Sequence, residues 1–307
     1  MQKVLITGGA GFIGSHTADL LISMGIPVRV LDNLSSGFRH NLPLGHELLE
    51  FVEGDIQDKS TVDECMQGIS HCLHLAAQVS VVASLEDPEF SAQQNIIGYL
   101  NVLDAVKRNG VKRLVYASSA AVYGNPSEIP LPETATKTQL SPYGLEKQVN
   151  EMYAQLYRTL YQVSSLGQRY FNVFGPRQDP KSPYAGVIAL FVDRISEARP
   201  LTVFGDGQQT RDFIYVGDVA RANVAALQSD VAGACNIGTG QQTSLLDLIA
   251  VLSDITGQQS EISFDAPREG DIVHSLSVTN KMNDELGVTA QTSLKHGLEI
   301  LIASQSG

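Results

Sequence analysis

Short apolar runs alternate with helix-like amphipathic segments through the first half of the chain. Six runs predict buried strands at residues 4–6, 28–31, 48–52, 72–75, 114–117 and 163–166. Between them, the hydrophobic period predicts helices at about residues 12–24, 61–66, 90–109 and 142–160. Strands that alternate with helices in this way indicate an α/β fold, in which helices cover both faces of a parallel sheet.

The pattern changes after about residue 175, where Gly and Pro become more frequent. Gly175-Pro176, Gly205-Asp206-Gly207 and Gly238-Thr239-Gly240 separate short segments, as turn sequences do. We therefore expect residues 1–172 to form mainly the sheet domain. Residues 173–307 are expected to form mainly a smaller, loop-rich α/β region, with some chain crossing between the two. A ligand is expected in the crevice between them.

Composition and charge narrow the classes of partner. The 307 residues are 43% hydrophobic and 18% charged, which is ordinary for a soluble globular protein of one or two domains. A net charge of -12 argues against nucleic acid and against an anionic membrane as partners. Cys65, Cys72 and Cys235 have no metal-ligand or redox-pair spacing, and neither a signal peptide nor a membrane-length apolar run is present. We expect a cytoplasmic protein without a metal site.

A glycine-rich turn follows the first predicted strand and opens the first predicted helix. Gly8, Gly11 and Gly14 have the spacing that lets the backbone approach a pyrophosphate, whose charge the helix N-terminus favours. Asp32 ends the second predicted strand, where a carboxylate accepts a hydrogen bond from a ribose hydroxyl. Because this carboxylate would repel a 2'-phosphate, a Rossmann-type site for NAD is favoured over one for NADP. A turn used only for packing is the alternative, but strand, turn, helix and acid all occur where the motif requires them.

Tyr143 and Lys147 stand four residues apart in the predicted helix at 142–160. Ser141 can cap this helix and Pro142 suits its first position, so one helical turn places the phenol and the ammonium on the same face. A free phenol, with a pKa of about 10, is a poor base at neutral pH, and a neighbouring cation favours its phenolate form. The pair is predicted to move protons. Taken alone, the spacing also fits a surface helix with an exposed Lys.

Taken together, these motifs occur in an order that is known from one family. The matching segments are Thr7 to Gly14, Asp32-Asn33-Leu34, His74 to Ala77, Ser118 to Gly124, Tyr143 to Lys147, Arg169 to Asn172, Arg211-Asp212-Phe213 and Arg268 to Asp271. The chain resembles the extended short-chain dehydrogenase/reductases and, within them, the nucleotide-sugar 4-epimerases. This resemblance implies a bound NAD and the epimerisation of UDP-hexoses at C4 through a 4-keto intermediate.

The resemblance also implies a role for each of Ser119, Tyr143 and Lys147, which we call the reacting group. Ser119 hydrogen-bonds the sugar 4-hydroxyl, Tyr143 removes its proton, and Lys147 holds the nicotinamide ribose and keeps Tyr143 acidic. The residues implied around the cofactor are Gly8, Gly11, Phe12, Ile13, Gly14, Asp32, Asn33, Asp55, Ile56, Leu75, Ala76, Ala77, Asn95, Tyr143, Lys147 and Tyr170. Asn95 supports the site through its backbone in the family, although an Asn on a helix face is more often only solvated. Likewise, an Asp after a strand is more often a turn residue.

The second half supplies most of the residues that the family uses to hold a nucleotide sugar. The residues implied around the substrate are Ser118, Ser119, Tyr143, Asn172, Val187, Phe204, Arg211, Arg268, Asp271 and Ser275. The planar fork of Arg suits phosphate oxygens. The plain alternatives are a surface salt bridge for either Arg, a core contact for Phe204 and a polar strand end for the two serines.

Ser275 bears on substrate choice, because the corresponding family position faces the substituent at C2 of the sugar. A Tyr there restricts the family enzymes to glucose and galactose, whereas a small residue leaves room for an N-acetyl group. We therefore expect both UDP-GlcNAc/UDP-GalNAc and UDP-Glc/UDP-Gal to be accepted. A loop serine without a ligand role is the alternative.

Two alanines after Ser119 bear on the type of reaction. Related dehydratases carry Asp-Glu at these positions and uronate decarboxylases carry Glu at the second, whereas this chain has Ala120 and Ala121. A methyl group cannot transfer a proton, which argues against both reactions. A UDP-glucuronate 4-epimerase, a nucleotide-sugar reductase and a non-catalytic dinucleotide sensor stay open. The family usually dimerises through two helices that correspond to residues 90–109 and 142–160, so we expect a homodimer.

Overall fold

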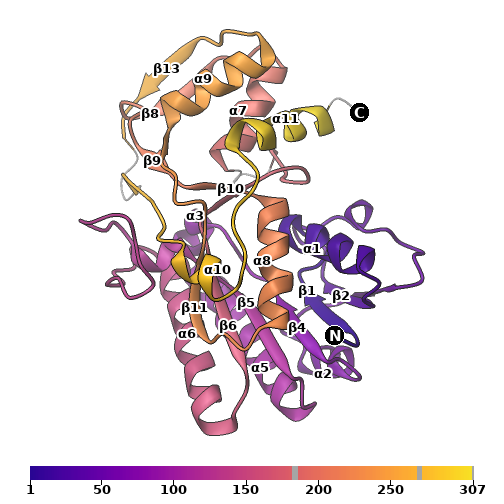
Figure 1. Ribbon diagram of the computed structural model, residues 1–307. Coiled ribbons are helices and arrows are strands. Elements are labelled where there is room, and N and C mark those ends of the chain that lie inside the picture. The colour runs from indigo at the N-terminus through magenta and orange to yellow at the C-terminus, as the bar shows by residue number, and fades with distance from the viewer. Residues whose placement is uncertain (182–185, 268–271, 306–307) are drawn as a thin grey trace.

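The computed structural model describes residues 1–181, 186–267 and 272–305, and its central feature is a parallel sheet of seven strands (Figure 1). The strands lie in the order β11-β6-β5-β4-β1-β2-β3, and each pairs in parallel with its neighbours. They are β1 (Val4–Thr7), β2 (Val28–Asp32), β3 (Leu49–Glu53), β4 (His71–His74), β5 (Arg113–Ser119), β6 (Ser165–Tyr170) and β11 (Gly233–Ile237). The predicted α/β fold with a doubly wound, Rossmann-type sheet is confirmed.

Six of these strands match the apolar runs within a few residues, and the seventh was not predicted. β11 comes from the second half of the chain and pairs with β6, where Cys235 lies opposite Gln168. Its sequence, Gly233–Ile237, includes the polar Asn236 and therefore has no continuous apolar run. Only its pairing with a strand from the first half makes it part of the sheet.

Helices cover both faces of the sheet because neighbouring residues of a strand point to opposite sides. The elements around the sheet are α1 (Phe12–Ser23), α2 (Lys59–Met66), α3 (Val81–Glu86), α4 (Pro88–Ala92), α5 (Gly98–Arg108), α6 (Pro142–Tyr161) and α8 (Val216–Gln228), with the short turns η1 (Arg39–Asn41), η2 (Gln93–Ile97, π-helical) and η3 (Ala120–Tyr123). Val4 and Ile6 of β1 belong to one buried cluster with side chains of α1 and α8. Leu5, between them, belongs to a second cluster with side chains of α2, α5 and α6. The sheet is thus the middle layer of three.

The helix predicted at residues 90–109 is divided into three parts in the structure. α4, the π-helical turn η2 and α5 follow one another without a break. A π turn holds one extra residue and is often found at functional sites. The hydrophobic period does not reveal such an insertion, because the apolar face continues on both sides of it.

The smaller region lies beyond one edge of the sheet domain and has a core of its own (Figure 1). Its elements are α7 (Val187–Ser196), α9 (Leu245–Thr256), α11 (Leu294–Gln305) and the strand pairs β7 (Asn172–Phe174) with β10 (Phe213–Tyr215), β8 (Leu201–Phe204) with β13 (Ile262–Asp265), and β9 (Thr210–Arg211) with β12 (Thr243–Ser244). The short helix α10 (Asn280–Asp284) follows in the chain but packs against β11 of the sheet domain (Figure 1). Three helices of 10 or 12 residues surround this core, and short strands with connecting loops complete the region. Glycines such as Gly257, which ends α9 in a left-handed conformation, are helix caps as well as loop residues.

Three structural absences concern the described part of the chain. Within it, no helix is both long enough and apolar enough to cross a membrane. No group of three or more His, Cys, Asp or Glu side chains in residues 1–181, 186–267 and 272–305 is placed to hold a metal ion. Cys65, Cys72 and Cys235 are buried and form no disulfide.

Candidate active site

The glycines of the turn between β1 and α1 are required for different reasons. Gly8 has a left-handed φ of +71°, and a Cβ on it would lie 2.6 Å from the backbone N of Ala76. A Cβ on Gly14 would lie 2.3 Å from the carbonyl O of Gly8, so both glycines let the chain pack on itself. A Cβ on Gly11, by contrast, would have one neighbour within 4 Å among the described residues, at 3.2 Å. The backbone at Gly11 is therefore open enough for a ligand to approach it.

The N-terminus of α1 lies at this opening. The N-cap residue is Gly11, which has no side chain to bond the first turn, and that turn, with Phe12 and Ile13, contains no acidic residue. The N–H groups of the turn and the positive end of the helix dipole are therefore available to an anion. A phosphate group of a dinucleotide suits such a helix end.

Asp32, at the end of β2, hydrogen-bonds the backbone of the glycine turn. Its Oδ2 accepts the N–H of Ala10 at 2.9 Å, and its Oδ1 accepts the N–H of Leu34 at 2.8 Å. Burial raises the pKa of Asp32, and these backbone N–H groups offset part of the rise. Beside it, Asn33 Nδ2 donates to Asp55 Oδ2 at 2.8 Å. The remaining lone pairs of the Asp32 carboxylate suit ribose hydroxyls, so the residues at this edge fit NAD.

The other residues predicted around the cofactor follow strands β3, β4 and β6. The segment Leu75-Ala76-Ala77 continues from β4 and packs directly against Gly8. Ile56, after β3, is buried. Tyr170, the last residue of β6, donates from its hydroxyl to Oδ1 of Asn223 at 2.7 Å. The hydroxyl of Tyr170 is thus occupied by a hydrogen bond inside the core. A ligand could contact only the ring or the backbone of Tyr170.

Ser119, Tyr143 and Lys147 come together where β5 ends and α6 begins. The side chain of Ser119 lies close enough to the phenol of Tyr143 to lower its pKa, and Lys147 Nζ lies 5.6 Å from the centre of the Tyr143 ring. The backbone N–H of Tyr143 donates to Ser84 Oγ at 3.2 Å, which holds the first turn of α6. The Oγ of Ser119 also accepts the N–H of Ala121, at 3.1 Å. A hydroxyl, a phenol and an ammonium therefore converge, as is needed to take a proton from an alcohol.

Burial dominates the electrostatics of Tyr143 and Lys147. Burial raises the pKa of Tyr143, the side chain of Ser119 lowers it, and the charge of Glu146 raises it. Burial also lowers the pKa of Lys147 to about 8, and Glu146 opposes this change. At Tyr143, the loss of water around the phenolate outweighs the favourable contacts. That Lys147 keeps Tyr143 acidic stays a prediction.

Asn95 points inward from the π-helical turn and is buried. Its Oδ1 accepts the backbone N–H of Gln78 at 2.9 Å, and its Nδ2 donates to the carbonyl O of Gln78 at 2.8 Å. The alternative of a merely solvated Asn is therefore wrong. Asn95 fixes the segment that continues from Leu75-Ala76-Ala77.

Ser118 and Ser119 are neighbours on β5, so their side chains point to opposite sides of the strand. The hydroxyl of Ser118 is buried and donates to Oε1 of Glu151 at 2.7 Å. The structure therefore does not bring this hydroxyl to the phenol of Tyr143, although both serines are predicted to contact the substrate. The alternation of side chains along a strand is the reason.

The predicted substrate residues of the second half lie on several short elements. They are Asn172 at the start of β7, Val187 at the start of α7, Phe204 at the end of β8, Arg211 at the end of β9, and Ser275 in the segment before α10. Arg211 Nη1 donates to the carbonyl O of Thr210 at 3.0 Å. The same oxygen accepts the N–H of Ser275 at 3.1 Å, so Arg211 and Ser275 lie on adjacent segments. Arg268 and Asp271 lie outside the described residues.

Sequence similarity connects this geometry with known proteins. The model of the NAD dependent epimerase/dehydratase family matches residues 4–238, which is more than half of the chain. The chain belongs to this family. The match includes the glycine turn, the strand end with Ser119 and the helix with Tyr143 and Lys147.

Relatives within the NAD dependent epimerase/dehydratase family match nearly the whole chain. A putative UDP-glucose 4-epimerase from Methanocaldococcus jannaschii is 40% identical over 303 residues, which is 97% of each chain. The structure of a UDP-N-acetylglucosamine 4-epimerase from Methanobrevibacter ruminantium, in complex with UDP-N-acetylmuramic acid, is 35% identical and has a TM-score of 0.96 over 99% of this chain and 98% of the other. The structure of a Thermus thermophilus UDP-glucose 4-epimerase in complex with NAD is 36% identical and has a TM-score of 0.93 over 100% and 99%. The likeness therefore extends through both halves.

Two residues of this epimerase-family site are missing from the prediction. Glu146 lies between Tyr143 and Lys147 in the chain and is buried. Helical spacing is the signal that could have found it, because position i+3 shares a face with Tyr143. Gly37 packs directly on the glycine turn, since a Cβ on it would lie 2.9 Å from the carbonyl C of Ala10. Only the folded turn reveals that contact.

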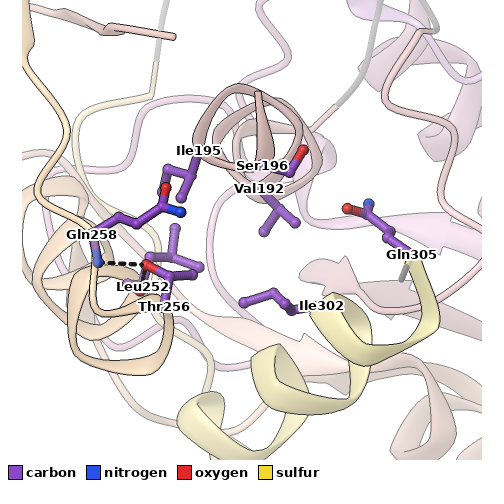
Figure 2. Close-up of a pocket in the computed structure, with 8 residues that line it drawn as sticks. All are labelled: Val192, Ile195, Ser196, Leu252, Thr256, Gln258, Ile302 and Gln305. Carbon is purple, nitrogen blue, oxygen red and sulfur yellow. Dashed lines mark hydrogen bonds between the residues drawn. The ribbon is translucent and has the colours of Figure 1, made fainter. Parts of the chain in front are cut away.

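A cavity of about 330 Å³ opens between α7, α9 and α11 of this family member, away from the residues above (Figure 2). It is lined by Val192, Ile195, Ser196, Leu252, Thr256, Gln258, Ile302 and Gln305. None of these eight side chains is ionisable, and none is a predicted site residue. The cavity therefore cannot supply acid–base chemistry, and Ser119, Tyr143 and Lys147 lie outside its lining.

Proposed function

We propose that this family member is a UDP-hexose 4-epimerase with a bound NAD cofactor. It interconverts UDP-Glc with UDP-Gal and UDP-GlcNAc with UDP-GalNAc. The observation that carries the proposal is the convergence of Ser119, Tyr143 and Lys147 in a chain whose glycine turn fits NAD. The relatives described as UDP-glucose and UDP-N-acetylglucosamine 4-epimerases support both sugar classes.

Each residue of the reacting group has one task in this proposal. Tyr143 takes the proton of the sugar 4-hydroxyl, and Ser119 holds that hydroxyl toward the phenol. Because a C–H bond gives up a hydride only as its oxygen loses the proton, the base has to be fixed at that oxygen. When bound, NAD supplies the hydride acceptor and a positive ring that favours the phenolate form of Tyr143. Lys147, which is charged below its pKa of about 8, holds the nicotinamide ribose.

The same proposal assigns the binding residues. The pyrophosphate of NAD is assigned to the N-terminus of α1 at Gly11, and a ribose to Asp32. The residues assigned to the nucleotide sugar are Asn172, Val187, Phe204, Arg211 and Ser275, with Arg268 and Asp271 outside the described residues. Residues 1–172 then mainly serve the cofactor and residues 173–307 mainly the substrate, although α8 and β11 of the second half complete the sheet domain.

Product analysis without added cofactor tests the proposed function. The purified protein is incubated with UDP-Glc, UDP-GlcNAc and UDP-GlcA, and the products are separated by chromatography. C4 epimers of the first two sugars are expected, with protein-bound nicotinamide that takes up an isotopic label from C4. Conversion that consumes added NADH stoichiometrically indicates a reductase instead, and turnover of UDP-GlcA alone indicates a uronate epimerase.

Replacing Ser275 with tyrosine is expected to block the N-acetyl substrates selectively. Ser275 is 5% exposed and tied to Thr210 through its backbone, so a larger side chain has to grow into the space beside it. Overpacking of 1–3 kcal/mol lowers kcat/KM for UDP-GlcNAc roughly 10- to 100-fold. The UDP-Glc reaction, measured on the same preparation, is the control and is expected to change little. Unaltered turnover of UDP-GlcNAc places the gate elsewhere.

We also propose a homodimer formed through the continuous helix α4–η2–α5 and through α6. Large apolar side chains are exposed along one stripe of α6, at Leu145, Met152, Leu156 and Leu160. Sedimentation equilibrium is expected to give twice the chain mass for the parent and the chain mass for Met152→Glu, because a buried unpaired carboxylate opposes association. Leu190→Glu, on α7, is the matched control and is expected to stay dimeric. A monomeric parent rules out this assembly.

A cytoplasmic location is part of the proposal as well. Cys65, Cys72 and Cys235 are free and buried, which is the usual state of thiols in a reducing compartment. Activity that partitions with the soluble cytoplasmic fraction of the source cells is expected, and recovery from a secreted fraction contradicts it.

A further inference from the structure

Glu146 is a buried carboxylate inside the reacting group, and the mechanism above does not use it. It is 3% exposed and lies on α6 between Tyr143 and Lys147. Its Oε2 accepts Ser91 Oγ at 2.9 Å and Asn95 Nδ2 at 2.6 Å. Its Oε1 is buried and has no hydrogen-bond partner among the described residues. Because burying a charge costs several kcal/mol unless it is compensated, Glu146 requires an explanation.

The partners of Glu146 form a closed ring with Gln78. Asn95 bonds both backbone groups of Gln78, and Gln78 Nε2 donates to Ser91 Oγ at 3.2 Å. The ring therefore joins three parts of the site: helix α6, the α4–η2 helix, and the segment after β4 that packs on the glycine turn. A shift of α6 relative to that segment would break at least one of these bonds.

The charged and titratable groups around Glu146 are few. Tyr143 and Lys147 belong to its own helix, and the charge of Glu146 acts on both of them. His74, on β4, lies near Lys147 and is neutral, because burial lowers its pKa to about 3. The other elements that meet Glu146 present the uncharged Ser91, Asn95 and Gln78. Among the described residues, Lys147 is therefore the cation that compensates this carboxylate.

We propose that Glu146 is a positioning residue, which ties α6 to the segment after β4 and places a negative charge beside Tyr143 and Lys147. The proposal rests on the proposed epimerase function and adds a residue to it. The unpartnered Oε1 is the physical basis, because an oxygen without a donor leaves its charge available to the neighbouring ammonium. The large majority of buried side-chain polar atoms have a hydrogen-bond partner, so the orphaned Oε1 calls for a role beyond structure.

The test is the pH profile of kcat/KM for Glu146→Gln. The charge of Glu146 raises the pKa of Tyr143 and the pKa of Lys147, so its removal lowers both. Since Tyr143 has to be deprotonated and Lys147 protonated, the acidic and the alkaline limbs are both expected to move to lower pH, by about 1 pH unit. A lower rate with both limbs in place shows a structural role only and overturns the proposal.

Three further variants make this test specific. Glu146→Asp keeps the charge, so its limbs are expected to stay at the parent positions even if the rate falls. Glu89→Gln removes an exposed charge from α4 and is expected to leave the profile unchanged. Glu146→Ser introduces a smaller, uncharged side chain that can still hydrogen-bond Ser91 and Asn95. This variant replaces Glu146→Gln in the test if Glu146→Gln does not fold. Loss of the fold in both neutral variants overturns the proposal, because the carboxylate would then serve stability.

A second readout does not depend on turnover. The phenolate absorbance of Tyr143 is isolated by subtracting the spectrum of Tyr143→Phe in the same background, and it is titrated with and without Glu146→Gln. The midpoint is expected to fall by the same amount as the acidic limb. An unchanged midpoint contradicts the role of Glu146, whereas an inactive parent contradicts the proposed function and leaves this titration as the deciding measurement.

Discussion

Replacing Tyr143 with phenylalanine is expected to lower kcat by a factor of about 10² to 10⁴, the usual contribution of a positioned acid–base group. The variant keeps the ring that packs beside Ser119 and Lys147 and loses only the oxygen that takes the proton. Without that oxygen, a hydride cannot leave the sugar carbon while its hydroxyl is still protonated. The measurement is the rate of UDP-Gal formation from UDP-Glc at saturating substrate.

The controls for this variant separate chemistry from folding. The amount of protein-bound nicotinamide is expected to stay close to the parent value, because the variant leaves the glycine turn and Asp32 unaltered. Tyr161→Phe removes a hydroxyl from the exposed end of the same helix and is expected to retain full activity. A Tyr143→Phe enzyme that keeps more than a tenth of the parent rate contradicts the assignment of this residue as the base.

Local chemistry explains what could be predicted from the sequence. The turn at Gly8 to Gly14, the acid at Asp32 and the pair Tyr143/Lys147 each depend on residues close together in the chain. For such motifs, strand period, helix spacing and capping are enough to fix the local geometry. The helix that carries the pair begins at Pro142 after the cap at Ser141, as its sequence predicts.

Long-range contacts explain what could not be predicted. β11 belongs to the sheet only through its pairing with β6, and the inward turn of Asn95 depends on a π-helical insertion that leaves the apolar pattern intact. The direction of the pKa change at Tyr143 follows from burial, which the sequence does not specify. Ser118 shows the same limit: its partner, Glu151, is known only after α6 has packed on β5.

Glu151 belongs to a buried ion pair that connects β5 with its surroundings. Arg169 on β6 and Glu151 on α6 pair through two bonds of 2.7 Å, with side chains that are 3% and 12% exposed. Arg169 Nη1 also donates to the hydroxyl of Tyr123 and to the carbonyl O of Glu133, both at 2.8 Å. With Ser118 bonded to the same carboxylate, the pair fixes the end of β5 from which Ser119 projects.

Replacing Arg169 with methionine is therefore expected to lower the free energy of unfolding by about 3–5 kcal/mol, measured by urea denaturation. Most of this loss comes from the buried Glu151 carboxylate that is left without its cation, so the double variant with Glu151→Met is expected to recover part of it. Arg108→Met breaks an exposed ion pair with Asp63 and is expected to change the midpoint only slightly. If Arg169→Met and Arg108→Met lose equal stability, the buried pair does not hold the strand end.

The stability loss in Arg169→Met is expected to come with a lower kcat, because Ser119 follows Ser118 directly in the chain. If the double variant regains stability but not kcat, the ion pair positions Ser119 in addition to stabilising the fold.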